Sequence, residues 1–285
     1  MQAFIQQAKL RLAPLYTPQE ISRIVRLLLE KEASVDAVSY YADKDRKIPP
    51  SVLTSLHMAL DRLSRHEPLE YVLETADFAG LKLLVDNRVL VPRPETEELV
   101  EWILHDVREQ GGNTPTRILD LCTGSGCIAI ALAKAWPLSH IEGWDVSTEA
   151  LTVAAINAKN NKTNIRFNCV DVLSAKPSVD ESDVYDLIAS NPPYVCRSES
   201  SDMAPNVLDY EPHLALFVED EDPLIFYSAI ARFGKKCLKP RGLLYVEING
   251  QLGEQTTCLF KEEGYLDVTL KKDLFGKDRF VKAMR

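Results

Sequence analysis

The sequence has 285 residues, of which 46% are hydrophobic and 26% charged, and its formal net charge is -9. The length exceeds one typical domain, so we expect one domain with an appendage; the acidic balance argues against broad, sequence-independent binding to nucleic acid, although it leaves a local basic patch open. No apolar run is long enough to span a bilayer, and residues 1–10 lack the layout of a signal peptide, which together predict a cytoplasmic protein without a membrane anchor.

The cysteines show no pattern of a metal site. The sequence contains six of them, and no two are spaced as C-x-x-C. Scattered cysteines in apolar runs are typical of reduced, buried thiols, so we expect neither zinc nor disulfides. The six are Cys122, Cys127, Cys169, Cys196, Cys237 and Cys258.

Residues 1–75 have a helical pattern. Thr17-Pro18-Gln19-Glu20 has the layout of an N-cap, a proline at the first helical position and a capping-box acid, and apolar residues follow it at helical spacing. A second helix is expected to open at Pro49-Pro50. These residues predict a small all-helical N-terminal domain.

Residues 76–92 change to alternating apolar and polar positions, which predicts a β-hairpin linker with its turn at Asp86-Asn87. The second domain is then expected over residues 93–285. It opens with Pro92-Arg93-Pro94-Glu95-Thr96, where Glu95 or Thr96 could cap a helix that runs through about Gln110 and closes at the loop Gly111-Gly112-Asn113.

A strand over residues 117–121 is followed by a glycine-containing turn, Cys122-Thr123-Gly124-Ser125-Gly126, and then by a helix. Glycines at a strand-to-helix turn allow the backbone to approach a ligand closely. A second strand ends with Asp145, where a carboxylate can bind a ribose diol. Asp120, just before the turn, is expected to order this turn or to contact an amino group of the ligand.

The remaining chain alternates between strands and helices. A third strand ends at Asp171-Val172, where the acid could accept a hydrogen bond from an adenine amino group and the valine could pack on the ring, although a solvated loop acid is an equal alternative. Residues 196–222 form a long polar loop of the kind that often covers a substrate. This alternation predicts an α/β fold with a mostly parallel sheet wrapped by helices.

The fourth strand ends at Asn191-Pro192-Pro193-Tyr194. Because proline has no N–H and keeps the preceding residue extended, the Asn191 side-chain oxygen and the Pro192 carbonyl can both point out of the strand end. Two neighbouring acceptors suit an –NH2 group, and Tyr194 offers a face on which a planar group can stack.

The glycine turn with Asp145 also fits the dinucleotide fingerprint, so this motif alone does not separate a dehydrogenase from an S-adenosylmethionine enzyme. Hydride transfer has no need of two carbonyl acceptors at Asn191 and Pro192, whereas methylation of a planar nitrogen does. Holding both N–H bonds of such a nitrogen can direct its lone pair toward the methyl group, so that orientation and electrostatics supply most of the acceleration.

The chain resembles the peptide chain release factor glutamine N5-methyltransferase family (the HemK/PrmC type) over nearly its whole length. Asn-Pro-Pro-Tyr alone is shared with adenine-N6 methyltransferases, and its combination with the proline-rich segment is more specific. The resemblance is carried by Pro92-Arg93-Pro94-Glu95-Thr96-Glu97, Asp120-Leu121-Cys122-Thr123-Gly124-Ser125-Gly126, Ser190-Asn191-Pro192-Pro193-Tyr194 and Tyr210-Glu211-Pro212.

This resemblance implies a seven-stranded methyltransferase sheet, S-adenosylmethionine as cofactor, and class I release factors as protein substrates. It places the methionine part of the cofactor at Cys122, Thr123, Gly124, Ser125 and Gly126, its ribose at Asp145 and its adenine at Asp171 and Val172, with Asp120 and Asn191 close by. Asn191, Pro192, Pro193 and Tyr194 would hold the glutamine, and the N-terminal domain would help to bind the release factor.

Two positions depart from the family, which commonly has glycine where this chain has Cys122 and Glu74. Two other functions stay open from sequence. Adenine-N6 methylation of DNA or RNA predicts a basic groove and a target-recognition insertion, which the composition and length do not support. A non-catalytic adaptor with a vestigial fold is disfavoured by intact Asn191, Tyr194 and Asp145.

Overall fold

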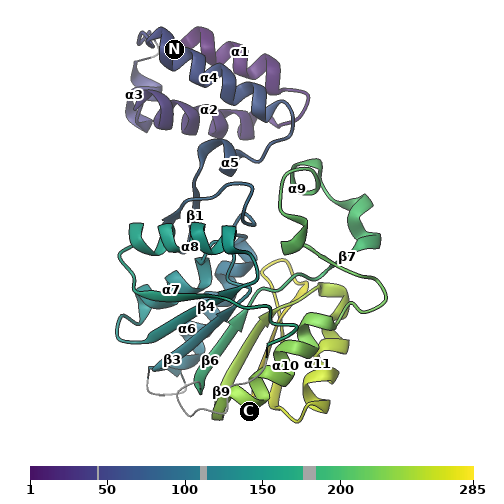
Figure 1. The fold of residues 1–285 in the computed structure, drawn as a ribbon. Coiled ribbons are helices and arrows are strands. Elements are labelled where there is room, and N and C mark those ends of the chain that lie inside the picture. Colours follow the sequence, from purple (N-terminus) through teal and green to yellow (C-terminus); the bar gives the residue numbers. More distant parts are fainter. Residues whose placement is uncertain (44, 110–113, 176–183) are drawn as a thin grey trace. The chain divides into compact units, whose positions relative to one another are not determined.

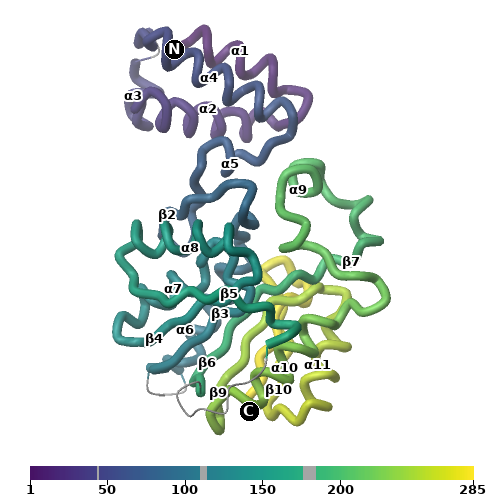
Figure 2. The backbone as a smooth tube through the Cα atoms, in the orientation of Figure 1, coloured from purple at the N-terminus to yellow at the C-terminus, as the bar shows by residue number. Residues whose placement is uncertain are grey.

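The computed structural model describes residues 1–43, 45–109, 114–175 and 184–285. The chain divides into two compact units, the first formed by residues 1–75 with 204–210 and the second by residues 76–203 with 211–285. Figures 1 and 2 follow the chain from its N-terminal helices to its last strands. None of the helices within the described ranges is long and apolar enough to cross a bilayer.

The first unit is helical. It contains α1 (Gln2–Leu12), α2 (Pro18–Ala33), α3 (Ala37–Ala42), α4 (Pro50–Leu63), α5 (Leu69–Leu73) and α9 (Pro205–Leu208). The predicted capping box is confirmed, since the Glu20 carboxylate accepts from the Thr17 N–H at 2.7 Å and the Thr17 hydroxyl accepts from the Glu20 N–H at 3.3 Å. One apolar core, which includes Leu28, Leu56 and Leu60, joins α1 to α5.

Glu74, which follows α5, has φ 53°, in the left-handed region that favours glycine. Its backbone therefore has the conformation that a glycine would adopt there, at a cost of about 1–2 kcal/mol for a residue with a Cβ. Glu74 therefore forms the same turn that a glycine would form at this position, although the residue type differs.

The second unit begins with a short hairpin of β1 (Ala76–Phe78) and β2 (Leu81–Leu83). Its turn lies at Ala79-Gly80, both with positive φ, which suits the twist of a tight hairpin. The hairpin turn was predicted at Asp86-Asn87, and this position was wrong. A turn does form there, with the Val89 N–H donating to the Asp86 carbonyl at 3.1 Å, but it lies outside any strand.

A seven-stranded sheet forms the centre of the second unit, in the order β10-β11-β9-β6-β3-β4-β5. All neighbouring strands are parallel except at β11, which is antiparallel to both of its neighbours. The predicted mostly parallel α/β fold is confirmed. The strands are β3 (Arg117–Leu121), β4 (His140–Asp145), β5 (Ile165–Cys169), β6 (Tyr185–Ser190), β9 (Leu238–Glu247), β10 (Leu266–Lys272) and β11 (Asp278–Met284).

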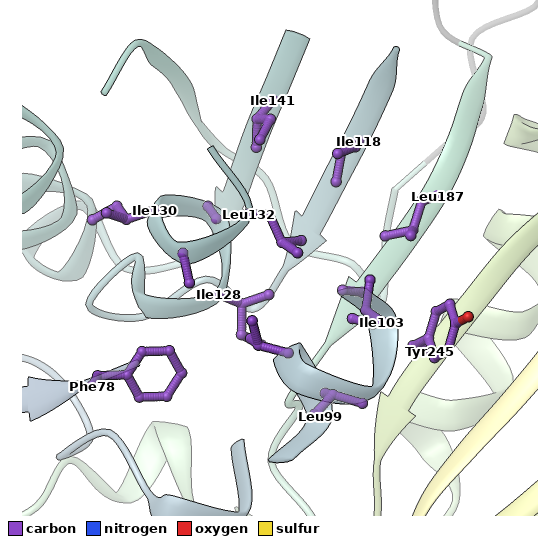
Figure 3. Packing of buried hydrophobic residues seen from close by; sticks show 14 of the residues in the cluster. Phe78, Leu99, Ile103, Ile118, Ile128, Ile130, Leu132, Ile141, Leu187 and Tyr245 are labelled. Atoms are coloured by element: carbon purple, nitrogen blue, oxygen red, sulfur yellow. The ribbon is translucent and has the colours of Figure 1, made fainter. Parts of the chain in front are cut away.

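Helices cover both faces of this sheet because successive strand residues point to opposite sides. On one face, Ile118, Leu187 and Tyr245 pack against α6 (Pro94–Glu109), α7 (Cys127–Ala135) and α8 (Thr148–Asn160); Figure 3 shows this core from close by. On the other face, Leu119 and Ile188 pack against α10 (Ile225–Cys237) and α11 (Gly253–Glu262). The end of the helix predicted through Gln110, and its loop at 111–113, lie outside the described residues.

The long connection after β6 carries, besides α9, other short elements: β7 (Val195–Cys196), two 3-10 turns at Arg197–Asp202 and His213–Ala215, and β8 (Phe217–Val218). A further 3-10 turn at Gly250–Leu252 follows β9. The chain leaves β3 toward β4 on one side, while β6 pairs with β3 on the other. The strand order therefore reverses between β3 and β6, and open α/β sheets bind ligands at the carboxyl ends of strands at such a point.

Candidate active site

The glycine turn follows β3 at its carboxyl end. Gly124 has φ 53° with open space where a Cβ would stand, while Gly126 has φ 81° and a Cβ there would meet Ala154 Cβ at 3.2 Å. Gly124 thus allows a ligand to approach the backbone, and Gly126 allows α7 and α8 to pack closely. Cys122 has φ 59°, so its backbone keeps the left-handed geometry that explains why glycine is common at this position.

Asp120 is fully buried beneath this turn. Its Oδ2 accepts from the Thr123 hydroxyl at 2.6 Å and from the Ala129 N–H at 3.2 Å, so it orders the turn and the start of α7. Its Oδ1 is buried without a hydrogen-bond partner among the described residues. Burial raises the pKa of this carboxyl to about 7, although both hydrogen bonds oppose the shift.

Asp145 lies at the tip of β4 and fastens the turn from its other side. Its Oδ2 accepts from the Gly124 N–H at 2.8 Å and its Oδ1 from the Ser147 N–H at 2.9 Å. Burial raises its pKa, against the hydrogen bonds from these two N–H groups. Asp171 accepts from the Leu173 N–H at 2.9 Å, and Val172 beside it is buried.

Asn157 ties this turn to the chain that follows the hairpin. It is fully buried on α8, and its Nδ2 donates to the Ser125 carbonyl and to the Leu84 carbonyl, both at 3.0 Å. Its Oδ1 accepts from the Leu84 N–H at 2.6 Å. One side chain thus satisfies both backbone groups of Leu84 and one carbonyl of the glycine turn.

A cavity of about 290 Å³ opens beside the turn at the carboxyl ends of the strands. Its walls are mainly apolar, as is usual for sites that hold organic ligands. Asp120, Gly126, Pro192 and Tyr194 are not among the lining residues. Of the sequence-predicted site residues, the cavity brings together Cys122, Thr123, Gly124, Ser125, Asp145, Asp171, Val172, Asn191 and Pro193.

The fourth strand tip holds Asn191 through a hydrogen-bonded chain. Asn191 Nδ2 donates to Thr96 Oγ1 at 3.0 Å, and the Thr96 hydroxyl donates to Glu247 Oε2 at 2.7 Å. The Tyr194 hydroxyl donates to Glu247 Oε1 at 3.0 Å. Glu247 is only 1% exposed, and its burial raises its pKa while the hydrogen bonds from Thr96 and Tyr194 lower it.

The roles of Thr96 and Glu247 in holding Asn191 were not predicted from sequence. Thr96 was predicted as a possible helix cap and as part of the proline-rich motif that carries the family resemblance, but its bond to Glu247 was not predicted, and Glu247 was not considered at all. Thr96 lies in the first turn of α6 and directs its hydroxyl to Glu247. The available signal was Glu247 itself, a single acid inside the apolar run from Leu243 to Ile248, since a buried acid needs specific partners.

Glu211 shapes another part of the cavity wall. It is 3% exposed, and it accepts from the Val91 N–H at 3.1 Å and from the Arg93 guanidinium at 2.6 Å. Arg93 and the following Pro212 both line the cavity. The acid of the Tyr-Glu-Pro motif therefore fixes the proline-rich segment against the loop that contains Pro212.

The residues that line this cavity fit S-adenosylmethionine. The open space at Gly124 accommodates close backbone approach, Asp145 offers carboxylate oxygens at a strand tip for a diol, and Val172 offers an apolar surface for a ring. Within the described residues no cluster of His, Cys, Asp or Glu has the arrangement of a metal site.

Comparison with known proteins agrees with this geometry. Residues 3–73 match the family model of the PrmC N-terminal domain, and residues 101–209 match the methyltransferase small domain. The chain is 41% identical over 283 residues to a release factor glutamine methyltransferase of Bacteroides thetaiotaomicron, covering 99% of this chain and 98% of the relative. It is 39% identical over 273 residues to the one of Lactococcus lactis, covering 95% and 96%.

Solved structures show the same fold at low identity. The catalytic domain of hMettl16 is similar with a TM-score of 0.53 and 20% identity over 81% of each chain. The T. Thermophilus rRNA methyltransferase RsmC, in complex with AdoMet and guanosine, is similar with a TM-score of 0.51 and 15% identity, covering 74% of this chain and 49% of that one.

Proposed function

The chain belongs to the family of release factor glutamine methyltransferases, and we propose that it methylates the side-chain amide nitrogen of the glutamine in the Gly-Gly-Gln tripeptide of class I peptide chain release factors. It is an S-adenosylmethionine-dependent protein-glutamine methyltransferase that acts in translation termination. Its place of action is the cytoplasm, where its protein substrate is made.

The observation that carries this proposal is that Asn191 and the glycine turn line one cavity. S-adenosylmethionine supplies a methyl group on a sulfonium, which is an electrophilic carbon. Cys122, Thr123, Gly124 and Ser125 hold the methionine part, while Asp120 orders the turn and Gly126 lets α7 and α8 pack closely behind it. Asp145 binds the ribose, and Asp171 with Val172 flanks the adenine.

The glutamine amide is a poor nucleophile because its nitrogen lone pair is delocalised. Asn191 Oδ1 and the Pro192 carbonyl accept its two N–H bonds and orient the nitrogen toward the methyl group, while Pro193 and Tyr194 flank the carboxamide. A strong base is not required, because the methylated nitrogen becomes acidic as positive charge develops. Orientation of this kind is worth several kcal/mol.

The N-terminal helical domain, residues 1–75, contributes to binding of the release factor, and residues 76–92 link it to the catalytic domain at 93–285. A protein substrate is favoured over nucleic acid, because the net charge of -9 argues against a broad basic surface. The Asn-Pro-Pro-Tyr motif alone would also serve adenine-N6 methylation, so the experiment includes that substrate.

The test is methyl transfer from tritium-labelled cofactor to purified release factor, with mass spectrometry to locate the modified residue. We expect label on one glutamine of the release factor and none on duplex DNA or RNA. A release factor in which that glutamine is replaced by alanine is the matched control. Label on nucleic acid but not on protein, or no transfer at all, would contradict the proposal.

A further inference from the structure

The neighbours of Asn191 determine which end of its side-chain amide, the oxygen or the –NH2 group, faces Thr96. Glu247 receives a hydrogen bond on each oxygen, from Thr96 on Oε2 and from Tyr194 on Oε1. Since the threonine hydroxyl has a single hydrogen and donates it to Glu247, the Thr96 oxygen can only accept from Asn191. Only the Nδ2 end of the Asn191 amide can donate, and it does so at 3.0 Å.

The consequence for the cavity concerns the other end of the Asn191 amide. Within the described part of the chain, Asn191 Oδ1 has no hydrogen-bond partner, and Asn191 lines the cavity. Rotating the amide by half a turn would place two oxygens, Oδ1 and Thr96 Oγ1, against each other with no hydrogen between them. Such a contact costs about as much as one lost buried hydrogen bond, roughly 1–3 kcal/mol.

The hydrogen-bonded side chains of Asn191, Thr96, Glu247 and Tyr194 are held rigidly. Thr96 is 2% exposed and Glu247 is 1% exposed, so water does not compete for either group. The Tyr194 carbonyl accepts from Asn249 Nδ2 at 3.1 Å, and the same Nδ2 donates to Glu199 at 2.9 Å. Tyr194, which donates the second hydrogen bond to Glu247, is therefore held by its backbone carbonyl as well as by its hydroxyl.

We propose that Glu247 and Thr96 are positioning residues that make Asn191 present an acceptor, and not a donor, to the cavity, so that the site selects a side chain ending in –NH2 over a carboxylate of the same size. This inference rests on the proposed function, because it takes glutamine as the substrate side chain. A glutamate would place its oxygens against Asn191 Oδ1 and the Pro192 carbonyl with no hydrogen to share, whereas glutamine donates to both.

The decisive variants are Thr96→Val, which keeps the shape and removes the hydroxyl, and Thr96→Ser, which keeps the hydroxyl. The measurement is calorimetric binding of the release factor and of its Gln→Glu form, both in the presence of S-adenosylhomocysteine so that no turnover occurs. We expect the parent protein and Thr96→Ser to prefer the glutamine form by about tenfold or more. In Thr96→Val the Asn191 amide is released from its fixed direction, so the preference falls to less than about threefold.

The turnover number, kcat, is the second quantity to measure. We expect kcat of Thr96→Val to fall about 100-fold, because a misoriented acceptor no longer directs the glutamine nitrogen, and kcat of Thr96→Ser to stay within about fivefold of the parent value. Cofactor affinity and the thermal unfolding midpoint of each variant show whether the fold is intact. If Thr96→Val does not fold, Thr96→Ala is measured for the same preference.

The result that overturns the inference is a Thr96→Val protein that folds, binds cofactor and keeps the full preference for glutamine over glutamate. This result leaves the proposed function standing, since the parent protein would still methylate the release factor. The proposed function fails in a different experiment, when the parent protein transfers no methyl group to that glutamine.

Discussion

The two halves of the cavity are built in different ways. The half around the glycine turn comes from short sequence distances: Asp120 bonds Thr123 and Ala129, and Asp145 bonds a residue 21 positions earlier. The half around Asn191 joins residues 95 and 151 positions apart, Asn191 with Thr96 and Thr96 with Glu247. The first half is a property of one βαβ segment, whereas the second exists only once α6, β6 and β9 have assembled.

This difference suggests that the two halves fail separately. A change in the glycine-turn half should act on cofactor binding, and a change in the Asn191 half should act on the substrate amide. Each of the following substitutions affects one half.

The largest effect is expected for Asn191→Ala. Removal of one preorganised group that acts on the reacting centre costs about 100- to 1000-fold in kcat, so we expect methyl transfer to release factor to fall by this factor. Cofactor affinity, measured by calorimetry, should stay within about threefold of the parent value. A loss of cofactor binding equal to the loss of activity would show that the two halves are one unit.

Asp120→Asn addresses the glycine-turn half through pH. Because burial raises the pKa of Asp120 to about 7, the folded protein keeps this proton in a range where the unfolded chain, with an ordinary pKa near 3.8, has released it. The folded state then binds more protons than the unfolded state, and this carboxyl lowers stability as pH rises from about 4 to 7.

Asparagine cannot ionise, so Asp120→Asn lacks this loss of stability with rising pH. At about 1.4 kcal/mol per pKa unit, we expect the free energy of unfolding of Asp120→Asn, relative to the parent, to rise by up to about 4 kcal/mol between pH 4 and pH 8. Urea unfolding of both proteins across this range measures it. A relative stability that is flat with pH would mean that Asp120 is ionised in the fold.

Asp145→Asn should have an intermediate effect. The carboxylate accepts from Gly124 and Ser147, one on each oxygen, and an amide can satisfy only one of these N–H groups. Loss of one hydrogen bond to a charged group costs about 1.5–3 kcal/mol, so the dissociation constant of the cofactor should rise about 10- to 100-fold. Saturating cofactor should restore most of the kcat; a kcat that stays low would place Asp145 in the substrate half.

Cys122→Gly should have the smallest effect. The backbone at Cys122 already has a left-handed φ of 59°, so glycine would adopt the same turn and release about 1 kcal/mol of strain, while the lost contacts of the thiol offset part of this gain. We expect cofactor affinity to change by less than about threefold in calorimetry. A change above tenfold would mean that the thiol itself contacts the cofactor.

The sequence allowed correct prediction of what depends on near neighbours. The capping box at Thr17 and Glu20, the glycine turn and the position of Asp145 at a strand tip were all confirmed, because each follows from backbone chemistry within a few residues or from the ends of parallel strands. The alternation of strands and helices likewise predicted a mostly parallel sheet, and the family resemblance implied its seven strands.

Prediction failed at the hairpin turn and at the partners of buried groups. The hairpin turn was placed at Asp86-Asn87, yet Ala79-Gly80 forms it with positive φ at both residues, between the paired residues Phe78 and Leu81. The partnership of Thr96 with Glu247 spans 151 positions, and no local pattern determines which polar group will meet a buried acid. Tyr194 was expected to offer its ring to a ligand, and its hydroxyl also anchors Glu247.

Asn157 gives the glycine turn a mechanical link beyond the cavity. Its amide bonds the Ser125 carbonyl and both backbone groups of Leu84, and Asn157 is fully buried, so a shift of the turn would break the buried hydrogen bond between Asn157 Nδ2 and the Ser125 carbonyl. The glycine turn and the chain just after the hairpin are therefore positioned by the same side chain.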